Sequence, residues 1–179
     1  VNGVSQVVTI APFKAPHAFQ ALGGIAVLAD HTYAAIKGRE KLKTQWGTSE
    51  HDTYDSDAYR DELMATVEKE GVVVRQKGDY KEAVKGLKIH SASYYAPHLL
   101  HQPMEPPVAT ADFKDGRCIV WAPTQNPQAA QDVVAAALKI PASQVTVHVT
   151  LLGGGFGRKS KPDYVAEAAL LSQKVGRPV

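Results

Sequence analysis

The sequence contains a single cysteine, Cys118, among its 179 residues. A disulfide needs two cysteines, a structural zinc site usually needs more, and an iron–sulfur cluster needs about four. These residues alone therefore cannot hold a disulfide framework or an iron–sulfur cluster. The sequence also lacks any run approaching the ~18 uninterrupted apolar residues of a membrane-spanning helix, so we expect no membrane span. No signal peptide is visible at its start.

The sequence also lacks a large excess of one charge. It contains 20 Lys and Arg residues and 18 Asp and Glu residues, which gives a formal net charge of +2. This balance is too small to indicate nucleic acid, and we expect no such partner. The charge is nevertheless uneven: residues 50–70 hold eight acidic and two basic side chains, whereas thirteen basic and eight acidic ones follow Glu70. The pattern indicates a solvated acidic face followed by a mildly basic domain.

Both ends are typical of a piece of a longer protein, because Val1 is not an initiator methionine and the chain stops just after Gly176-Arg177-Pro178. In the first half, Pro12 and Pro16 follow a β-branched run, and Asp30 is the candidate cap of a helix whose middle Gly38 weakens. The expected elements are strands at 4–10 and 25–28, a helix at 30–42, a short strand ending near Trp46, a helix at 57–69, a strand at 72–75, a helical turn at 81–85 and a strand at 89–95.

The second half has a clearer pattern. Lys114-Asp115-Gly116 is typical of a hairpin turn, and Asn126 followed by Pro127 is typical of a helix start. The expected elements are strands at 108–113 and 117–121, a helix from Pro127 that stops before Pro141, a strand at 145–151 and a helix from Pro162 to Val175. Together the two halves predict an α+β chain.

The strongest local signal is Gly153-Gly154-Gly155-Phe156-Gly157-Arg158-Lys159, between a strand and a helix. Glycines let main-chain N–H groups approach a bulky ligand, and a helix N-terminus attracts anions. A dinucleotide fingerprint and a P-loop both need glycine at the position of Arg158, so neither pattern is met. The alternative is a tight turn that only lets the helix and strand pack closely.

Two further segments are candidates. His98 and His101, three residues apart, precede Met104-Glu105-Pro106-Pro107. Prolines prevent a regular helix there, and packed or turn-capping histidines are favoured over a metal site. The second segment contains Thr124 and Gln125, which either connect a strand to a capped helix or point polar groups at a ligand. Cys118 falls within an expected strand and is read as an inert buried thiol.

In combination these segments resemble the large subunit of molybdenum hydroxylases, the xanthine dehydrogenase/aldehyde oxidase family. The resemblance is carried by Gly153–Arg158, Thr124–Pro127 and His101 with Met104-Glu105-Pro106, and it is nearest to the isoquinoline 1-oxidoreductase beta-subunit type. It extends to residues 26–46, which resemble the end of an α/β hammerhead domain. The resemblance therefore predicts a hammerhead-like segment at 1–77 and the first part of a molybdopterin-binding domain at 78–179.

The resemblance also implies the cofactor, molybdopterin with molybdenum, of the cytosine dinucleotide form. In this family the glycine–phenylalanine loop approaches the cofactor, whose pterin dithiolene holds the metal, so no protein ligand to the metal is expected. The cofactor-binding residues that it implies are Glu105, Thr124, Gln125, Gly154, Gly155, Phe156, Gly157 and Arg158.

Such enzymes hydroxylate an electron-poor carbon, and the resemblance implies that electrons leave through an iron–sulfur subunit or domain. The resemblance implies that the general-base glutamate lies beyond Val179, so we expect no catalytic residue here and an inactive piece without bound cofactor. Leu99, Leu100 and Ser160 differ from the xanthine type, which favours an N-heteroaromatic or aldehyde substrate over a purine. The sequence does not distinguish a periplasmic from a cytoplasmic location in a bacterial cell.

Two alternatives from other classes remain at this point. The first is a phosphate- or nucleotide-binding module that uses the loop from Gly153 to Lys161. The second is a non-catalytic assembly domain that contacts a sister subunit, or that forms a homo-oligomer through an apolar face exposed where the domain is cut.

Overall fold

The computed structural model describes residues 1–12 and 19–179, and Pro16, expected after the first strand, lies outside them. The chain divides into two compact units. The first comprises residues 1–44 and 101–179, and the second comprises residues 45–100. The helices and strands are mixed along the chain, in agreement with the predicted α+β class.

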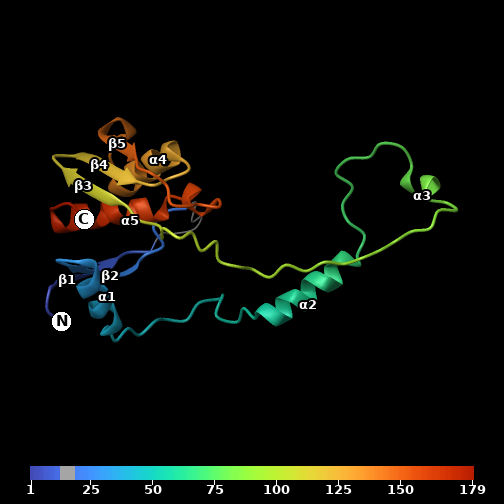
Figure 1. Cartoon of the computed structure of the whole chain (residues 1–179), viewed down its shortest axis with the longest axis horizontal. Helices are drawn as coiled ribbons and strands as arrows, with labels where there is room; N and C mark the ends of the chain where they lie inside the picture. The colour runs from blue at the N-terminus through green and yellow to red at the C-terminus, as the bar shows by residue number, and fades with distance from the viewer. Residues whose placement is uncertain (13–18) are drawn as a thin grey trace. The chain divides into compact units, whose positions relative to one another are not determined.

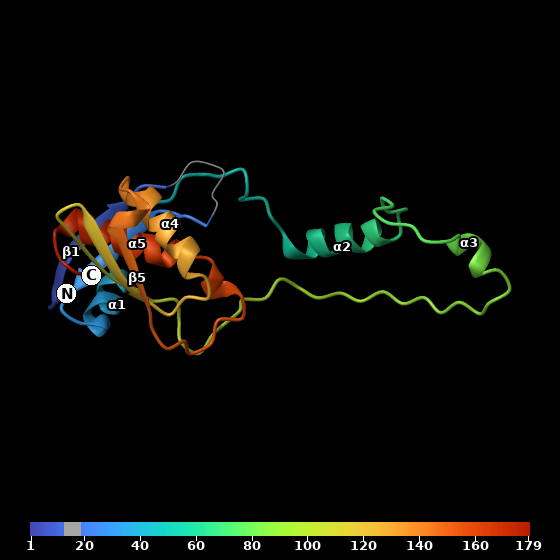
Figure 2. The same cartoon turned by 90° about the horizontal axis from the view of Figure 1, so that it is seen from above.

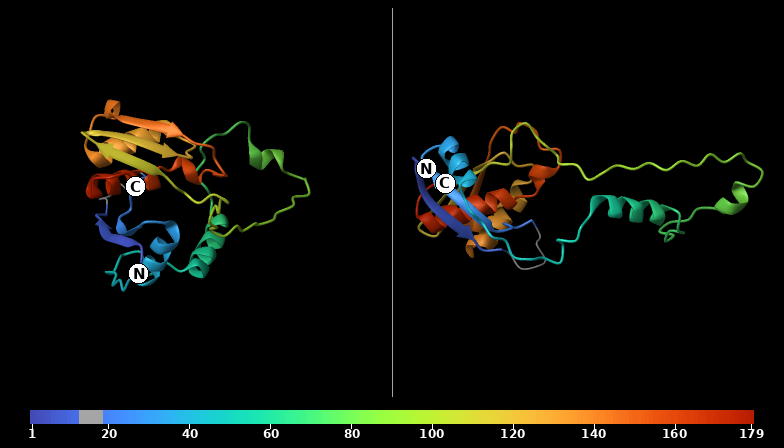
Figure 3. Two further views of the ribbon diagram at one scale, coloured as in Figure 1. Left: turned by 60° about the vertical axis from the view of Figure 1, so that its left-hand side comes forward. Right: turned by 90° about the horizontal axis from the view of Figure 1, so that it is seen from below.

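The first unit begins with an antiparallel hairpin, β1 (Val4–Ile10) and β2 (Gly24–Ala29), in which Val7 lies opposite Val27. Helix α1 (Thr32–Glu40) follows and packs on this hairpin (Figure 3). Gly38 allows the close approach, because a Cβ there would lie 2.7 Å from Val27 Cγ1 and 2.8 Å from Val4 Cγ2. The cap is His31 rather than the expected Asp30, since the His31 Nδ1 accepts a bond from the Ala34 N–H.

A three-stranded sheet forms the rest of the first unit, with the strand order β3 (Thr110–Lys114), β4 (Arg117–Ala122), β5 (Val145–Val149). The pair β3–β4 is the predicted hairpin, and β4 and β5 are parallel. Helix α4 (Pro127–Leu138) makes the crossover between β4 and β5, and Asn126 caps it as predicted. The strand expected at 145–151 ends early, and Leu151 is 96% exposed.

The core of this unit lies between the sheet and two helices, α4 and α5 (Asp163–Val175), which both pack against it (Figures 1 and 2). Inward-facing residues alternate along β4, where Cys118, Val120 and Ala122 are buried between exposed neighbours. Val134 from α4 and Val165 from α5 are fully buried against them. This packing fixes the ends of β4 and β5, from which the candidate site is built.

The second unit contains α2 (Ser56–Val67), capped by Asp55, and the single turn α3 (Tyr80–Ala83), joined by irregular segments (Figure 1). Three predictions of strands are wrong, those near Trp46, at 72–75 and at 89–95, because residues 43–49, 72–75 and 89–95 are irregular. The reason is physical: a strand needs a hydrogen-bonding neighbour. The side chains of Val72, Val74 and Tyr94 are at least 90% exposed.

No helix of the described residues is both long and apolar enough to cross a bilayer.

Ser172 joins α5 to the sheet edge. Its hydroxyl is fully buried, accepts the Phe113 N–H at 2.9 Å and donates to the Arg177 carbonyl at 2.9 Å. We expect Ser172→Ala to lower the free energy of unfolding by about 1–3 kcal/mol, because it leaves buried polar groups unpaired. Urea unfolding measures this, and Ser143→Ala on an exposed turn is the control, with a change within about 0.5 kcal/mol. Equal effects of the two substitutions would contradict this role.

Cys118 is 1% exposed, as predicted for a buried thiol. Burial, with a smaller contribution from Asp112, raises the pKa of the thiol to about 11. Little thiolate is therefore present at pH 8, and the thiolate is the reactive form. We expect a chromogenic disulfide reagent to label the folded protein at least about 100-fold more slowly than the urea-unfolded protein. Similar rates in the two states would show that the thiol is accessible.

Candidate functional site

The candidate site lies at the carboxyl ends of the parallel strands β4 and β5. Thr124 and Gln125 follow the end of β4, and the glycine loop, residues 153–157, follows the end of β5 after residues 150–152. A third segment, residues 103–105, lies against the glycine loop, since Glu105 N–H donates to the Gly153 carbonyl at 3.2 Å. Adjacent parallel strands commonly place ligand-binding loops at this edge.

Glu105 binds the glycine loop at both of its ends. Its carboxylate oxygen Oε2 accepts the Gly153 N–H at 3.0 Å and also pairs with the Lys159 ammonium. The hydrogen bond from Lys159, followed by the one from the Gly153 N–H, lowers the pKa of Glu105 below its ordinary value. The resulting stabilisation is present at neutral pH and is lost as the pH falls through this lowered pKa.

Thr124 and Gln125 bind the same loop from the β4 side. The Thr124 hydroxyl donates to the Lys159 carbonyl at 3.0 Å, and the Gln125 N–H donates to the same carbonyl at 3.1 Å. The Gln125 side-chain oxygen accepts the Gly157 N–H at 3.1 Å. Both residues therefore hold the loop in place. A segment that only connected a strand to a helix would not need these bonds.

Two of the glycines make room for these side chains. A Cβ on Gly153 would lie 2.7 Å from the Glu105 Cβ, and a Cβ on Gly155 would lie 2.7 Å from the Gln125 Cδ. Gly154 and Gly157 instead have φ values of +97° and +86°, which side chains disfavour. The interpretation of this segment as a closely packed turn therefore describes one face of the loop, because Glu105 and Gln125 pack against its glycines.

The N–H groups at the centre of the loop have no partner in the described part of the protein. Among the described residues, no acceptor takes the main-chain N–H groups of Gly154, Gly155 and Phe156. Gly155 is buried, and a buried N–H without a partner is costly unless water or a bound group accepts from it. The Phe156 side chain is 73% exposed beside these groups. The loop thus offers hydrogen-bond donors and an aromatic ring to a ligand.

The Arg158 side chain is turned toward the start of α5, the helix that follows it. Its guanidinium makes two hydrogen bonds to the Asp163 carboxylate, at 2.9 and 2.7 Å, and one to the Lys161 carbonyl. The bond to Asp163 is the main reason that the pKa of Arg158 is raised. The predicted contact of Arg158 with phosphate or pterin stays a prediction.

Sequence reasoning missed the central role of Lys159, which it named only as the last residue of the glycine-rich segment. The side chain is completely buried, whereas Lys is rarely buried without a partner. Nothing in the local sequence distinguishes it from the neighbouring Lys161, whose ammonium lies 3.7 Å from the centre of the Phe19 ring. The signal that could have pointed to Lys159 is Glu105, an acid in an otherwise apolar Met-Glu-Pro-Pro turn.

The histidines of the predicted turn do not join this site. His101 is exposed, and the His98 ring lies 3.3 Å from the Tyr54 hydroxyl and packs near Tyr59 within the second unit. No cluster of three or more potential metal-ligating His, Cys, Asp or Glu side chains occurs in the described part of the chain.

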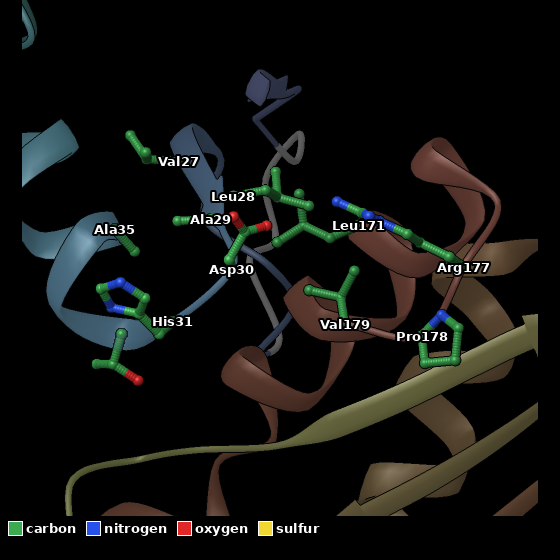
Figure 4. A pocket seen from close by; sticks show the side chains of 11 residues that line it. Val27, Leu28, Ala29, Asp30, His31, Ala35, Leu171, Arg177, Pro178 and Val179 are labelled. Atoms are coloured by element: carbon green, nitrogen blue, oxygen red, sulfur yellow. The ribbon is translucent and has the colours of Figure 1, made fainter. Parts of the chain in front are cut away.

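A separate cavity of about 570 Å³ lies in the first unit, away from the predicted residues. Figure 4 shows its walls, formed by the end of β2 and the start of α1 on one side and by Leu171 of α5 with the residues after α5 on the other. Asp30 and Arg177 bring opposite charges to it. None of the eight predicted cofactor-binding residues lines this cavity.

The fold and the loop define a cofactor-binding domain. The family model of the molybdopterin cofactor-binding domain matches residues 65–179, and the chain belongs to this family. The family resemblance predicted from the sequence is thereby confirmed.

Individual relatives agree with this assignment. The chain is 28% identical over 167 residues to isoquinoline 1-oxidoreductase subunit beta of Brevundimonas diminuta, covering 87% of this chain and 21% of that protein. It is 32% identical over 165 residues to the membrane-bound aldehyde dehydrogenase [pyrroloquinoline-quinone] of Gluconacetobacter polyoxogenes, covering 88% and 21%. This chain therefore spans about a fifth of the length of these relatives.

The crystal structure of quinoline 2-oxidoreductase from Pseudomonas putida 86 is similar in fold, with a TM-score of 0.66. The match covers all of this chain and 27% of that one at 22% sequence identity.

The residues present fit a molybdopterin cofactor. That group brings its own sulfur ligands for the metal, so the protein needs to supply donors and shape rather than a cluster of metal-binding side chains. The free N–H groups of Gly154 and Phe156 and the orphaned N–H of buried Gly155 are donors of this kind.

Gly153 should not tolerate a side chain. We expect Gly153→Ala to lower the free energy of unfolding by about 1–3 kcal/mol, because the new methyl group collides with the Glu105 Cβ, which cannot swing away. Thermal unfolding measures the loss. Gly71→Ala is the matched control, since no atom lies within 4 Å of its Cβ position. A Gly153→Ala protein as stable as the control would mean that this packing is looser than described.

Proposed function

We propose that this chain is part of the large subunit of a molybdenum-cofactor hydroxylase and that its glycine loop forms one wall of the cofactor site. The observation that carries the proposal is the arrangement of the loop: every main-chain N–H from Gly154 to Phe156 is free of acceptors among the described residues, while the loop's other face is bound to the protein. Membership in the molybdopterin-binding family supports the same group as the ligand.

When bound, molybdopterin with molybdenum supplies the chemistry that hydroxylates an electron-poor carbon. The residues of this chain bind and orient the group. The N–H groups of Gly154, Gly155 and Phe156 donate hydrogen bonds to its oxygen or sulfur atoms, and the Phe156 ring packs beside it. Gly157 and Arg158 complete the predicted contacts on the helix side.

Glu105, Thr124 and Gln125 contribute by holding the loop. Their bonds to Gly153, Gly157 and Lys159 keep the donors in one arrangement before the cofactor arrives, so little ordering is needed on binding. No residue of the described chain is proposed as the catalytic base, which we place elsewhere in the whole protein.

The substrate class that we propose is an N-heteroaromatic compound or an aldehyde. The names of the two relatives, an isoquinoline oxidoreductase and an aldehyde dehydrogenase, support these two classes. We further propose the cytosine dinucleotide form of the pterin. We also propose that electrons leave through an iron–sulfur subunit or domain outside these residues, because their one cysteine cannot hold such a cluster.

The division of the chain is also a proposal. We assign residues 1–77 to a hammerhead-like segment and residues 78–179 to the first part of the cofactor-binding domain. The hairpin β1–β2 with α1 supports the first assignment, and the family match supports the second.

The test uses the whole protein, produced in a host supplied with molybdate. We expect about one molybdenum and one pterin per chain by metal analysis and by fluorescence of the released pterin. A protein with pyrroloquinoline quinone and no molybdenum would contradict the proposal and favour the cofactor named for the aldehyde dehydrogenase. Turnover of isoquinoline against acetaldehyde then separates the two substrate classes.

A further inference from the structure

One ion pair, between Glu105 and the buried Lys159, holds the glycine loop near both of its ends. Gly153 begins the loop and Lys159 follows its end, and both donate to the same carboxylate oxygen, Glu105 Oε2. The Lys159 side chain is fully buried, and that of Glu105 is 33% exposed. One carboxylate thus sets the distance between the two ends of the loop.

Lys159 depends on this carboxylate. Within the described part of the chain, Glu105 is the acid within ion-pair distance of its ammonium. A buried ammonium without a counter-charge is strongly disfavoured, so the pair forms or breaks as a unit. The Lys159 carbonyl is bound in turn by Thr124 and Gln125, and this connects the pair to the end of β4.

The pair lies on the bound face of the loop, and the free N–H groups are at Gly154, Gly155 and Phe156, between its two attachment points. If either side-chain attachment is lost, that end of a short glycine-rich segment is held only by the bonds to the Gly153 carbonyl or to the Lys159 carbonyl. Glycine loses more conformational freedom than any other residue when it is ordered, so such a segment holds its shape only while both ends are fixed.

We propose that Glu105 and Lys159 are positioning residues, which fix the loop so that its free N–H groups match the cofactor. This inference rests on the proposed function. It differs from the sequence-based expectation that Glu105 contacts the cofactor itself, and it gives buried Lys159 a role that sequence reasoning did not assign.

The experiment compares hydrogen–deuterium exchange of the loop in whole protein made without molybdate, and cofactor content in whole protein made with it. The variants are Glu105→Gln, Lys159→Met and the double variant, in which neither charge is left buried. Glu40→Gln is the matched control, because Glu40 also pairs with a lysine, Lys37 at 2.8 Å, but on an exposed helix surface. Peptides from β4 give the reference exchange within each sample.

We expect the hydrogen-bonded N–H groups of the loop, those of Gly153 and Gly157, to exchange about tenfold faster in each single variant and in the double variant without cofactor, while β4 exchanges as in the wild type. Molybdenum and pterin per chain should fall several-fold in the same proteins. Glu40→Gln should change neither quantity. The double variant keeps the test decisive if a lone buried charge prevents folding of a single variant.

Three outcomes would overturn the proposal. Unchanged loop exchange with reduced cofactor content would show that Glu105 contacts the cofactor directly. Unchanged loop exchange with unchanged cofactor content would show that the pair has no role in binding. Faster exchange of β4 together with the loop, in every variant that can be purified, would show a general contribution to stability. Wild-type protein without molybdenum or pterin would instead contradict the proposed function, and the exchange measured without cofactor would still decide the role of the pair.

Discussion

The candidate site depends on the interactions that the Glu105 carboxylate makes with Gly153 and Lys159. It joins a turn at residues 103–105 to the start of the glycine loop and, through Lys159, to the segment that leads into α5. The strands β4 and β5 bring Gln125 and the loop to one edge of the sheet, but they do not determine the loop's shape. The shape comes from side chains that bind one face of the loop and leave the N–H groups of its centre unpaired.

Much of the fold could be predicted from local sequence patterns. The hairpin at Asp115-Gly116, the capped start of α4 and the alternation along β4 each depend on neighbouring residues, and each is present. The strands expected at 72–75 and 89–95 are absent, because their β-branched and alternating residues require a hydrogen-bonding neighbour that residues 45–100 do not provide. No residue of that unit is buried, so its apolar side chains gain little from removal from water.

Sequence patterns predict where the candidate site lies better than they predict how its side chains are arranged. Gly154, Gly155 and Phe156 were identified from the glycine pattern, and they carry the free N–H groups. Lys159 was not identified, because its burial depends on Glu105, which is distant in the sequence, and no local pattern encodes a contact of that range. Arg158 is a different case, because its partner Asp163 is only five residues away, at the start of the next helix, and it occupies the guanidinium that the resemblance assigned to the cofactor.

The packing of the loop against its own protein has a consequence for sequence divergence. The spaces beside Gly153 and Gly155 are filled by Glu105 and Gln125, two side chains contributed by separate segments. During evolution, a larger residue at position 155 would require a smaller one at position 125, so the two sites should change in concert rather than independently. Position 153 has less latitude still, because its neighbour is the rigid base of a charged side chain with a second attachment to keep.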